Sequence, residues 1–192
     1  MGRPELARRV AIPMLETARL LLRAFRPADA EAVTELVDDP VVSATLESIP
    51  YPYHREYADS WIAIHESLFR ERGELHLAIV LRASDQLVGA ASLLPPQQRG
   101  GPPQLGYWLG RRYWGCGYAT EAVEAIIRYA RQDLGVRKFA ARCMVDNHAS
   151  VAVLGKLGLR RVGRASQPVT KGERTCEVDE FLLEVDGATD VL

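Results

Sequence analysis

The sequence predicts a mixed α/β domain whose sheet is antiparallel at first, and three observations support this fold class. Apolar residues alternate over Leu75–Val80 and recur over Leu87–Leu94, with a polar turn between them, which indicates a β-hairpin. A third strand at Gln104–Leu109 is followed, after Gly117, by a helical repeat of apolar residues. The hydrophobic fraction of 47% is enough for a core, and no low-complexity stretch or internal repeat divides the chain.

The part of the domain before this hairpin is expected to contain one strand and two helices. Residues 1–14 are interpreted as a flexible tail, and residues 15–192 as the domain. A strand is expected at Leu20–Phe25, followed by a helix from Asp29 to Val37 that Asp39-Pro40 ends. A second helix closes near Gly73, and its apolar stripe is formed by Tyr57, Trp61, Ile64, His65 and Leu68.

The C-terminal half is expected to add two helices and three strands. The helix after Gly117 ends at Gly135, a typical C-cap glycine. Its buried stripe is predicted to be Ala119, Ala122, Val123, Ile126, Ile127 and Ala130. A short helix ended by Gly158 is marked by Ser150, Val153, Leu154 and Leu157. The three strands are expected at Lys138–Cys143, Arg160–Arg164 and Glu177–Val185, with the last two joined through Lys171-Gly172.

Charge and composition exclude several classes of function. The formal net charge of −1 argues against a nucleic-acid partner, and the four histidines lack metal-ligand spacing, so no metal is expected. No apolar run approaches the ~18 residues that would predict a membrane span. The basic N-terminus has no signal-peptide core, and Cys116, Cys143 and Cys176 do not form a disulfide pattern. These features predict a soluble cytoplasmic protein with reduced thiols.

Two glycines stand just before the long helix, at Gly115 and Gly117. A glycine-rich turn from a strand into a helix N-terminus is typical of an anion site, because the first-turn N–H groups are unpaired and the helix dipole is positive there. Main-chain donors for a phosphate or pyrophosphate would then be available from Gly115 through Tyr118, Ala119 and Thr120. The alternative is that the glycines only permit a tight turn.

Neither common nucleotide motif fits this turn. A P-loop requires a lysine after the second glycine, and Gly117 is followed by Tyr118. A Rossmann fingerprint requires a third glycine where Thr120 stands, and an acidic residue after the next strand, which ends in Arg142-Cys143.

The turn resembles the acetyl-CoA pyrophosphate loop of the GNAT superfamily of N-acetyltransferases, which reads [Q/R]-x-x-G-x-[G/A]. The matching residues are Arg112-Tyr113-Trp114-Gly115-Cys116-Gly117. Four segments in the same order resemble the branch of this family that contains RimJ and RimL: LETARLLLRAFRPADAEAV, LGYWLGRRYWGCGYATEA, NHAS and LGKLGLRRVG. The resemblance runs from Leu15 to Leu183.

This resemblance implies a GNAT fold: a mixed sheet of six to seven strands, splayed between its fourth and fifth strands, with about four helices. Acetyl-CoA would lie in the V, with its pantetheine arm along Trp108, Leu109 and Gly110. Its pyrophosphate would bind a loop that contains Arg112, Gly115, Cys116, Gly117, Tyr118, Ala119 and Thr120. Asn147 would hydrogen-bond the arm, and Ser150 would lie near the sulfur.

The implied reaction is direct attack of a primary amine on the thioester. The N–H of Leu109 would stabilise the charge that builds on the carbonyl oxygen. Leu154 stands where many relatives place a tyrosine acid, so the resemblance gives Ser150 the role of acid; the alternative is that Ser150 caps its helix. No Cys–His pair accompanies Cys116, so an acyl-cysteine mechanism is not expected.

The base and the acceptor are less well determined by the sequence. Gln104 stands where relatives often have a glutamate, and the substitutes to consider are Glu47, Glu177, Asp179 and Glu180. The acceptor site is expected in Val42–Tyr57 and the last hairpin. The acceptor is a protein N-terminal amine or a small molecule such as an antibiotic or polyamine. A non-catalytic acyl-CoA-binding module is a third option, and a homodimer stays open.

Overall fold

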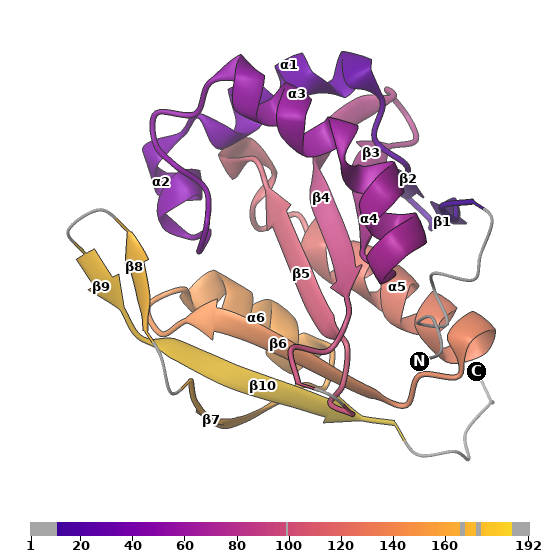
Figure 1. Ribbon diagram of the computed structural model, residues 1–192, viewed down its shortest axis with the longest axis vertical. Helices are drawn as coiled ribbons and strands as arrows, with labels where there is room; N and C mark the ends of the chain where they lie inside the picture. The colour runs from indigo at the N-terminus through magenta and orange to yellow at the C-terminus, as the bar shows by residue number, and fades with distance from the viewer. Residues whose placement is uncertain (1–10, 99, 166–167, 172–173, 186–192) are drawn as a thin grey trace.

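The computed structural model describes residues 11–98, 100–165, 168–171 and 174–185, so residues 1–10 of the expected tail and the expected connection at Gly172 lie outside them. Its main sheet has eight strands in the order β1-β2-β3-β4-β5-β6-β10-β7, and β8 and β9 form a separate hairpin (Figure 1). The strands are β1 (Leu15–Glu16), β2 (Leu20–Arg23), β3 (Leu75–Leu81), β4 (Gln86–Leu94), β5 (Gln104–Leu109), β6 (Lys138–Met144), β7 (Arg160–Arg164), β8 (Val169–Lys171), β9 (Arg174–Cys176) and β10 (Val178–Glu184).

The sheet opens between β5 and β6, as the splayed fold requires. Neighbouring strands from β1 to β5 pair antiparallel, and β6 pairs antiparallel with β10. The parallel pairing of β5 with β6 covers only Gln104 with Ala140 and Leu105 with Ala141. The rest of β5 diverges from β6, and Figure 1 shows the V between them. The prediction of a mixed sheet splayed between the strands at Gln104–Leu109 and Lys138–Cys143 is therefore confirmed, although the sheet has eight strands and not the six to seven expected.

Six α-helices and two short 3₁₀ helices lie in the described part of the chain, two more α-helices than expected. The helices are η2 (Pro27–Asp29), α1 (Ala30–Val37), α2 (Pro40–Ala44), α3 (Arg55–Ala63), α4 (His65–Arg72), η3 (Arg111–Tyr113), α5 (Tyr118–Leu134) and α6 (His148–Lys156). The helices α1 and α3 cover one face of the sheet in one apolar cluster, and α5 packs on the other face in a second cluster. None of the described helices is long and apolar enough to cross a membrane.

The first extra helix, α2, corrects the expectation that Asp39-Pro40 only ends a helix. The Asp39 side chain accepts hydrogen bonds from the N–H groups of Val41 at 2.7 Å and Val42 at 3.2 Å, so it caps α2. Pro40 occupies the first turn, where a missing N–H has no helical partner to lose. The same dipeptide therefore ends α1 and begins α2.

The second extra helix comes from a break inside the expected 57–68 helix, at Ile64 between α3 and α4. The predicted apolar stripe was partly wrong, since His65 is buried as expected but Tyr57 and Ile64 are each 47% exposed. The buried positions of the two helices are Ala58, Ile62, His65 and Phe69. Large aromatic residues dominated the sequence pattern, whereas a small alanine faces the core.

The helix α5 agrees with its prediction and positions the site. All six residues of its predicted stripe are buried, and Gly135 ends it with a φ of +67°. Its contacts with β4 and β5 fix the helix against the sheet, so its N-terminus lies where the chain leaves β5. The buried apolar stripe therefore holds the turn before α5 in place.

Candidate active site

The turn between β5 and α5 depends on backbone conformations that favour glycine. Gly115 has a φ of +75° and Gly117 a φ of +80°, both in the left-handed region. A Cβ at Gly115 would meet nothing within 4 Å, so the requirement there is conformational and not one of space. The indole Nε1 of Trp114 donates to the carbonyl of Leu109 at 2.8 Å, which ties the turn to the end of β5.

The N-terminus of α5 is open for an anion. Gly117 is the N-cap residue and makes no side-chain capping bond to the first turn. The N–H groups of Tyr118, Ala119 and Thr120 belong to that first turn, where the helix dipole is positive. The glycine pair therefore makes a tight turn and also leaves main-chain donors at the end of the V, so the two interpretations of the motif are compatible.

Trp108, Leu109 and Gly110 were expected to line the pantetheine arm, and of these three Leu109 is the residue whose main-chain N–H points into the V. The N–H of Gly110 donates to Val88 on β4 at 3.0 Å. Because bonds alternate along an antiparallel strand, the N–H of Trp108 also faces β4, and the N–H of Leu109 faces the edge that has left β6. The Trp108 side chain lies on the face of the sheet that α1 and α3 cover, with its ring centroid 6.5 Å from that of Trp61.

The first turn of α6 lies across the V from this edge. Asn147 is the N-cap residue of α6, and its side chain accepts the N–H of Ser150 at 3.0 Å. The alternative in which the Ser150 side chain caps the helix is therefore wrong, because Asn147 fills that position. Leu154, which replaces the tyrosine of many relatives, is fully buried in the core.

The Ser150 hydroxyl is paired with a tyrosine that the sequence analysis missed. The Oγ of Ser150 lies 2.8 Å from the hydroxyl of Tyr107, whose O–H also lies 3.2 Å from the Ser150 carbonyl. Burial raises the pKa of Tyr107 to about 12, so the phenol stays protonated at neutral pH. Burial likewise raises the pKa of the neighbouring Cys143 thiol to about 11. The strand pattern could have indicated this tyrosine, because neighbouring residues of a strand point to opposite faces of the sheet. Trp108 packs on the side of α1 and α3, so Tyr107 faces the side of α5 and α6.

A cavity of about 610 Å³ lies between the two segments in which the acceptor was expected. Its lining residues are Pro40, Ser43, Ala44, Glu47, Ser48, Ile49, Pro50, Tyr51, Thr170 and Cys176. The first eight come from α2 and the chain after it, and the last two from the β8–β9 hairpin, which faces α2 in Figure 1. Thr170 and Cys176 were not singled out as site residues, and the pairing of their strands, β8 and β9, was not predicted from the sequence.

The family of the chain follows from a match that covers well over half of its 192 residues. The family model described as an acetyltransferase (GNAT) domain matches residues 19–160. The chain belongs to the GNAT acetyltransferase family. It is an enzyme of the N-acetyltransferase class, which transfers an acetyl group to an amine.

Relatives and solved structures agree with this family. The chain is 28% identical to the N-acetyltransferase p20 of Bacillus licheniformis over 78% of its own length and 83% of that protein. It is 28% identical to the ribosomal-protein-serine acetyltransferase of Escherichia coli, over 62% of this chain and 66% of that one. The fold is similar to that of RimL, a ribosomal L7/L12 α-N-protein acetyltransferase solved with coenzyme A, with a TM-score of 0.79 at 22% identity, over 92% of this chain and all of that one.

The acidic residues considered as the general base differ in their surroundings. Arg161 and Arg164 bind Asp179, and their hydrogen bonds lower its pKa; Glu177 pairs with Arg164. Gln104 lies at the end of β5 that is still paired with β6, away from the open part of the V. Glu180 is exposed on β10.

Glu47 is the acidic candidate that borders the acceptor-side cavity. Its carboxylate lies 4.0 Å from the guanidinium of Arg142 on β6. Glu47 therefore lies at the cavity wall, whereas the carboxylate of Asp179 is held by two guanidinium groups.

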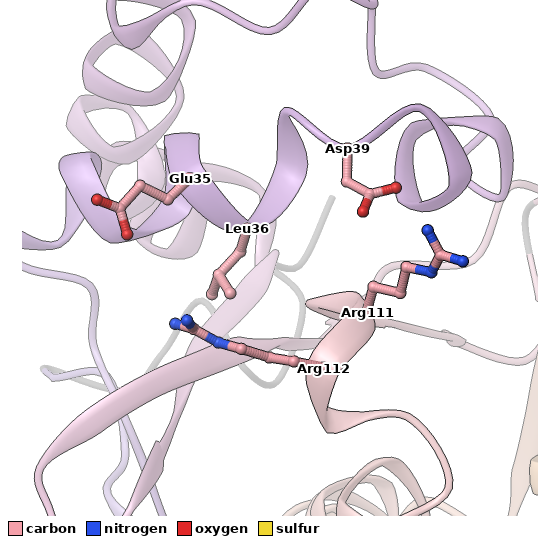
Figure 2. A pocket seen from close by; sticks show the side chains of 5 residues that line it. All are labelled: Glu35, Leu36, Asp39, Arg111 and Arg112. Carbon is pink, nitrogen blue, oxygen red and sulfur yellow. The ribbon is translucent and has the colours of Figure 1, made fainter.

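A second cavity, of about 530 Å³, holds the two arginines before the glycine turn of the GNAT loop (Figure 2). Arg111 extends toward Asp39, and Arg112 passes below Leu36 on the side of Glu35. The side chains therefore face α1 and the start of α2, so a role of Arg112 in binding phosphate stays a prediction. Among the described residues no group of three or more His, Cys, Asp and Glu side chains forms a metal site.

Proposed function

We propose that this GNAT enzyme binds acetyl-CoA in the V and acetylates the α-amine of a protein N-terminus. The observation that carries the proposal is the continuous path from the Leu109 edge of β5 to the uncapped N-terminus of α5. A strand edge can pair with the amide groups of a pantetheine arm, and a helix N-terminus can bind its pyrophosphate. The residues present therefore fit this substrate, with Asn147 at the opposite wall.

Acetyl-CoA supplies a thioester that an amine can attack directly. The amine nitrogen forms the new bond to the carbonyl carbon, and the bond from carbon to sulfur breaks. The N–H of Leu109 faces the gap and would donate to the carbonyl oxygen as charge builds there. Glu47, at the wall of the acceptor-side cavity, is the base that would take the proton of the attacking amine, directly or through water.

The hydroxyl pair of Ser150 and Tyr107 supplies the proton that the leaving thiolate needs. Tyr107 can donate to the Oγ of Ser150, which leaves the serine proton free to point at the sulfur. Because the pKa of Tyr107 is raised to about 12 by burial, the phenol is a constant donor near neutral pH. The pair replaces the tyrosine that is missing at Leu154.

The acceptor-side cavity supports a chain end as the substrate. It is bordered by segments about 120 residues apart in sequence, and among the described residues that line it Glu47 is the only carboxylate. A lone carboxylate beside apolar and hydroxyl groups suits one amine and a short length of peptide. The ribosomal-protein-serine acetyltransferase of Escherichia coli is a relative whose name denotes this class of acceptor.

The test is a thiol-release screen with acetyl-CoA and three sets of acceptors: short peptides with free N-termini, ribosomal proteins and small amines such as polyamines. We expect release with free peptides or proteins and none with the same peptides after N-terminal blocking. Faster release with a small amine would overturn the acceptor class and leave the acetyltransferase intact. Failure of acetyl-CoA to raise Tm would overturn the binding site itself, because a ligand that binds only the folded protein must stabilise it.

A further inference from the structure

The turn between β1 and β2 lies directly against the glycine loop, and nothing in the motif explains this contact. Arg19, from that turn, donates through Nη1 to the carbonyl of Cys116 at 3.0 Å. Its guanidinium also covers the Tyr118 ring, with Cζ 4.7 Å from the ring centroid. A Cβ at Gly117 would lie 3.3 Å from Nη2 of the same side chain. One arginine therefore touches three consecutive residues of the loop.

A carboxylate in the first turns of α5 holds this arginine in place. Glu121 accepts Nε of Arg19 at 2.7 Å on Oε2, and Nη2 lies 2.6 Å from the same oxygen. Its Oε1 accepts the main-chain N–H of Arg19 at 2.9 Å and the hydroxyl of Thr17 at 2.6 Å. Partial burial would raise the pKa of Glu121, but the hydrogen bonds from Thr17 and Arg19 outweigh it and lower the pKa. The carboxylate is therefore ionised and saturated with donors.

The bond to Cys116 fixes the direction of one peptide plane. In a trans peptide the C=O and the following N–H point in opposite directions. Since the Cys116 carbonyl points at Arg19, the N–H of Gly117 points away from the β1–β2 turn. This peptide turns about the ψ of Cys116 and the φ of Gly117, and a glycine accepts either sign of φ, so without the bond to Arg19 the peptide could rotate at little cost. The direction of the Cys116–Gly117 peptide decides whether the loop presents an N–H group or a carbonyl oxygen to a bound anion.

We propose that Arg19, held by Glu121, is a positioning residue that locks the Cys116–Gly117 peptide so that the Gly117 N–H faces the phosphates of acetyl-CoA. This inference rests on the proposed function, because acetyl-CoA is the ligand whose binding it controls. Arg19 contacts the back of the loop and is not a catalytic residue. The pairing also offsets the charge of Glu121, which would otherwise repel an anion at the helix N-terminus.

The test compares Arg19→Met with a matched control, Arg82→Met. Arg82 holds the same turn by donating to the Thr17 carbonyl at 2.8 Å, and its side chain is 48% exposed against 50% for Arg19. Arg82 is matched in exposure and differs in having Glu16 as its ion-pair partner. We expect Arg19→Met to raise KM and Kd for acetyl-CoA ~10-fold, the range for a lost charged hydrogen bond, with kcat at saturation within about two-fold. Arg82→Met should leave all three within about two-fold.

Two further measurements separate positioning from general stability. Arg19→Lys should give an intermediate KM, because an ammonium group keeps the charge but cannot hold Glu121 and Cys116 with a planar fork. The Gly117 amide resonance should shift when coenzyme A is added to the wild type, and the shift should be reduced in Arg19→Met. An equal rise of KM in Arg82→Met, or wild-type affinity in Arg19→Met, overturns the locking role alone. If the wild type itself does not bind acetyl-CoA, the proposed function falls as well.

Discussion

The proposed cofactor side and the proposed acceptor side of the site are built in different ways. The main-chain donors of the cofactor side come from one continuous stretch, Gln104–Leu134, which runs from strand to glycine turn to helix. The acceptor side joins Pro40–Tyr51 to residues of the β8–β9 hairpin, far away in sequence. The first side offers main-chain N–H groups, and the second offers side chains around a cavity. Side chains on the acceptor side can change without disturbing the main-chain N–H groups of the cofactor side. Such an arrangement allows the amine substrate to vary while acetyl-CoA stays the same.

The strongest test of this division is Gly117→Asp, which should abolish the rise in Tm that acetyl-CoA produces. A carboxylate at the helix N-cap would repel the pyrophosphate, and its side chain would enter the loop at a φ of +80°. Gly135→Asp is the matched control, because it places the same residue at a φ of +67° at the other end of α5. The control should lower Tm and keep the full ligand shift. A normal shift in Gly117→Asp would mean that the loop is not the phosphate site.

Ser150→Ala should lower kcat ~10²-fold while the acetyl-CoA shift in Tm is unchanged, as expected for a lost general acid. Since Asn147 provides the cap of α6, the unfolding free energy should change little. Tyr107→Phe should have a smaller effect in the same direction, because the serine proton remains. Steady-state kinetics and thermal unfolding on the same samples measure both quantities. Full activity in Ser150→Ala would mean that solvent protonates the thiolate.

Local pattern made the cofactor side predictable, whereas contacts across the fold made the rest difficult. The stripe of α5 and the bounds of Gln104–Leu109 follow from periodicities within one element, and they match the structure. The Tyr107–Ser150 pair joins two elements 43 positions apart, and the Arg19–Glu121 contact spans 102 positions. No local pattern encodes such pairs. The error in the stripe at 57–68 had another cause. The pattern predicted that the large side chain of Tyr57 faces the core, whereas the small Ala58 is the residue in contact with the core.

The acceptor side should respond to pH in a way that the cofactor side does not. Glu47→Gln should lower kcat/KM for a peptide amine ~10-fold or more at pH 7 and leave the KM for acetyl-CoA unchanged. An α-amine has a pKa of about 8, so above that pH it needs no base and the deficit should shrink. Glu177→Gln serves as the control, because Glu177 is paired with Arg164 and does not line the cavity. A deficit that stays constant to pH 9.5 would rule out Glu47 as the base.

The smallest effect is expected from the thiol in the loop. Cys116 is exposed, and its carbonyl, not its side chain, is the atom that Arg19 holds. Cys116→Ala keeps that carbonyl and the adjacent Gly117 N–H, so acetyl-CoA binding and turnover should stay within a few-fold of the wild type.

Direct transfer also predicts that no acetyl group ever rests on Cys116, because the amine attacks the thioester itself. Mass spectrometry of the enzyme held with acetyl-CoA alone and quenched in acid should therefore find the thiol unmodified. Alkylation is a weaker test, since added bulk near the phosphates would inhibit either mechanism. An acetylated Cys116 that an amine removes, together with an inactive Cys116→Ala, would instead establish a two-step transfer and place a side chain among the main-chain groups of the cofactor side.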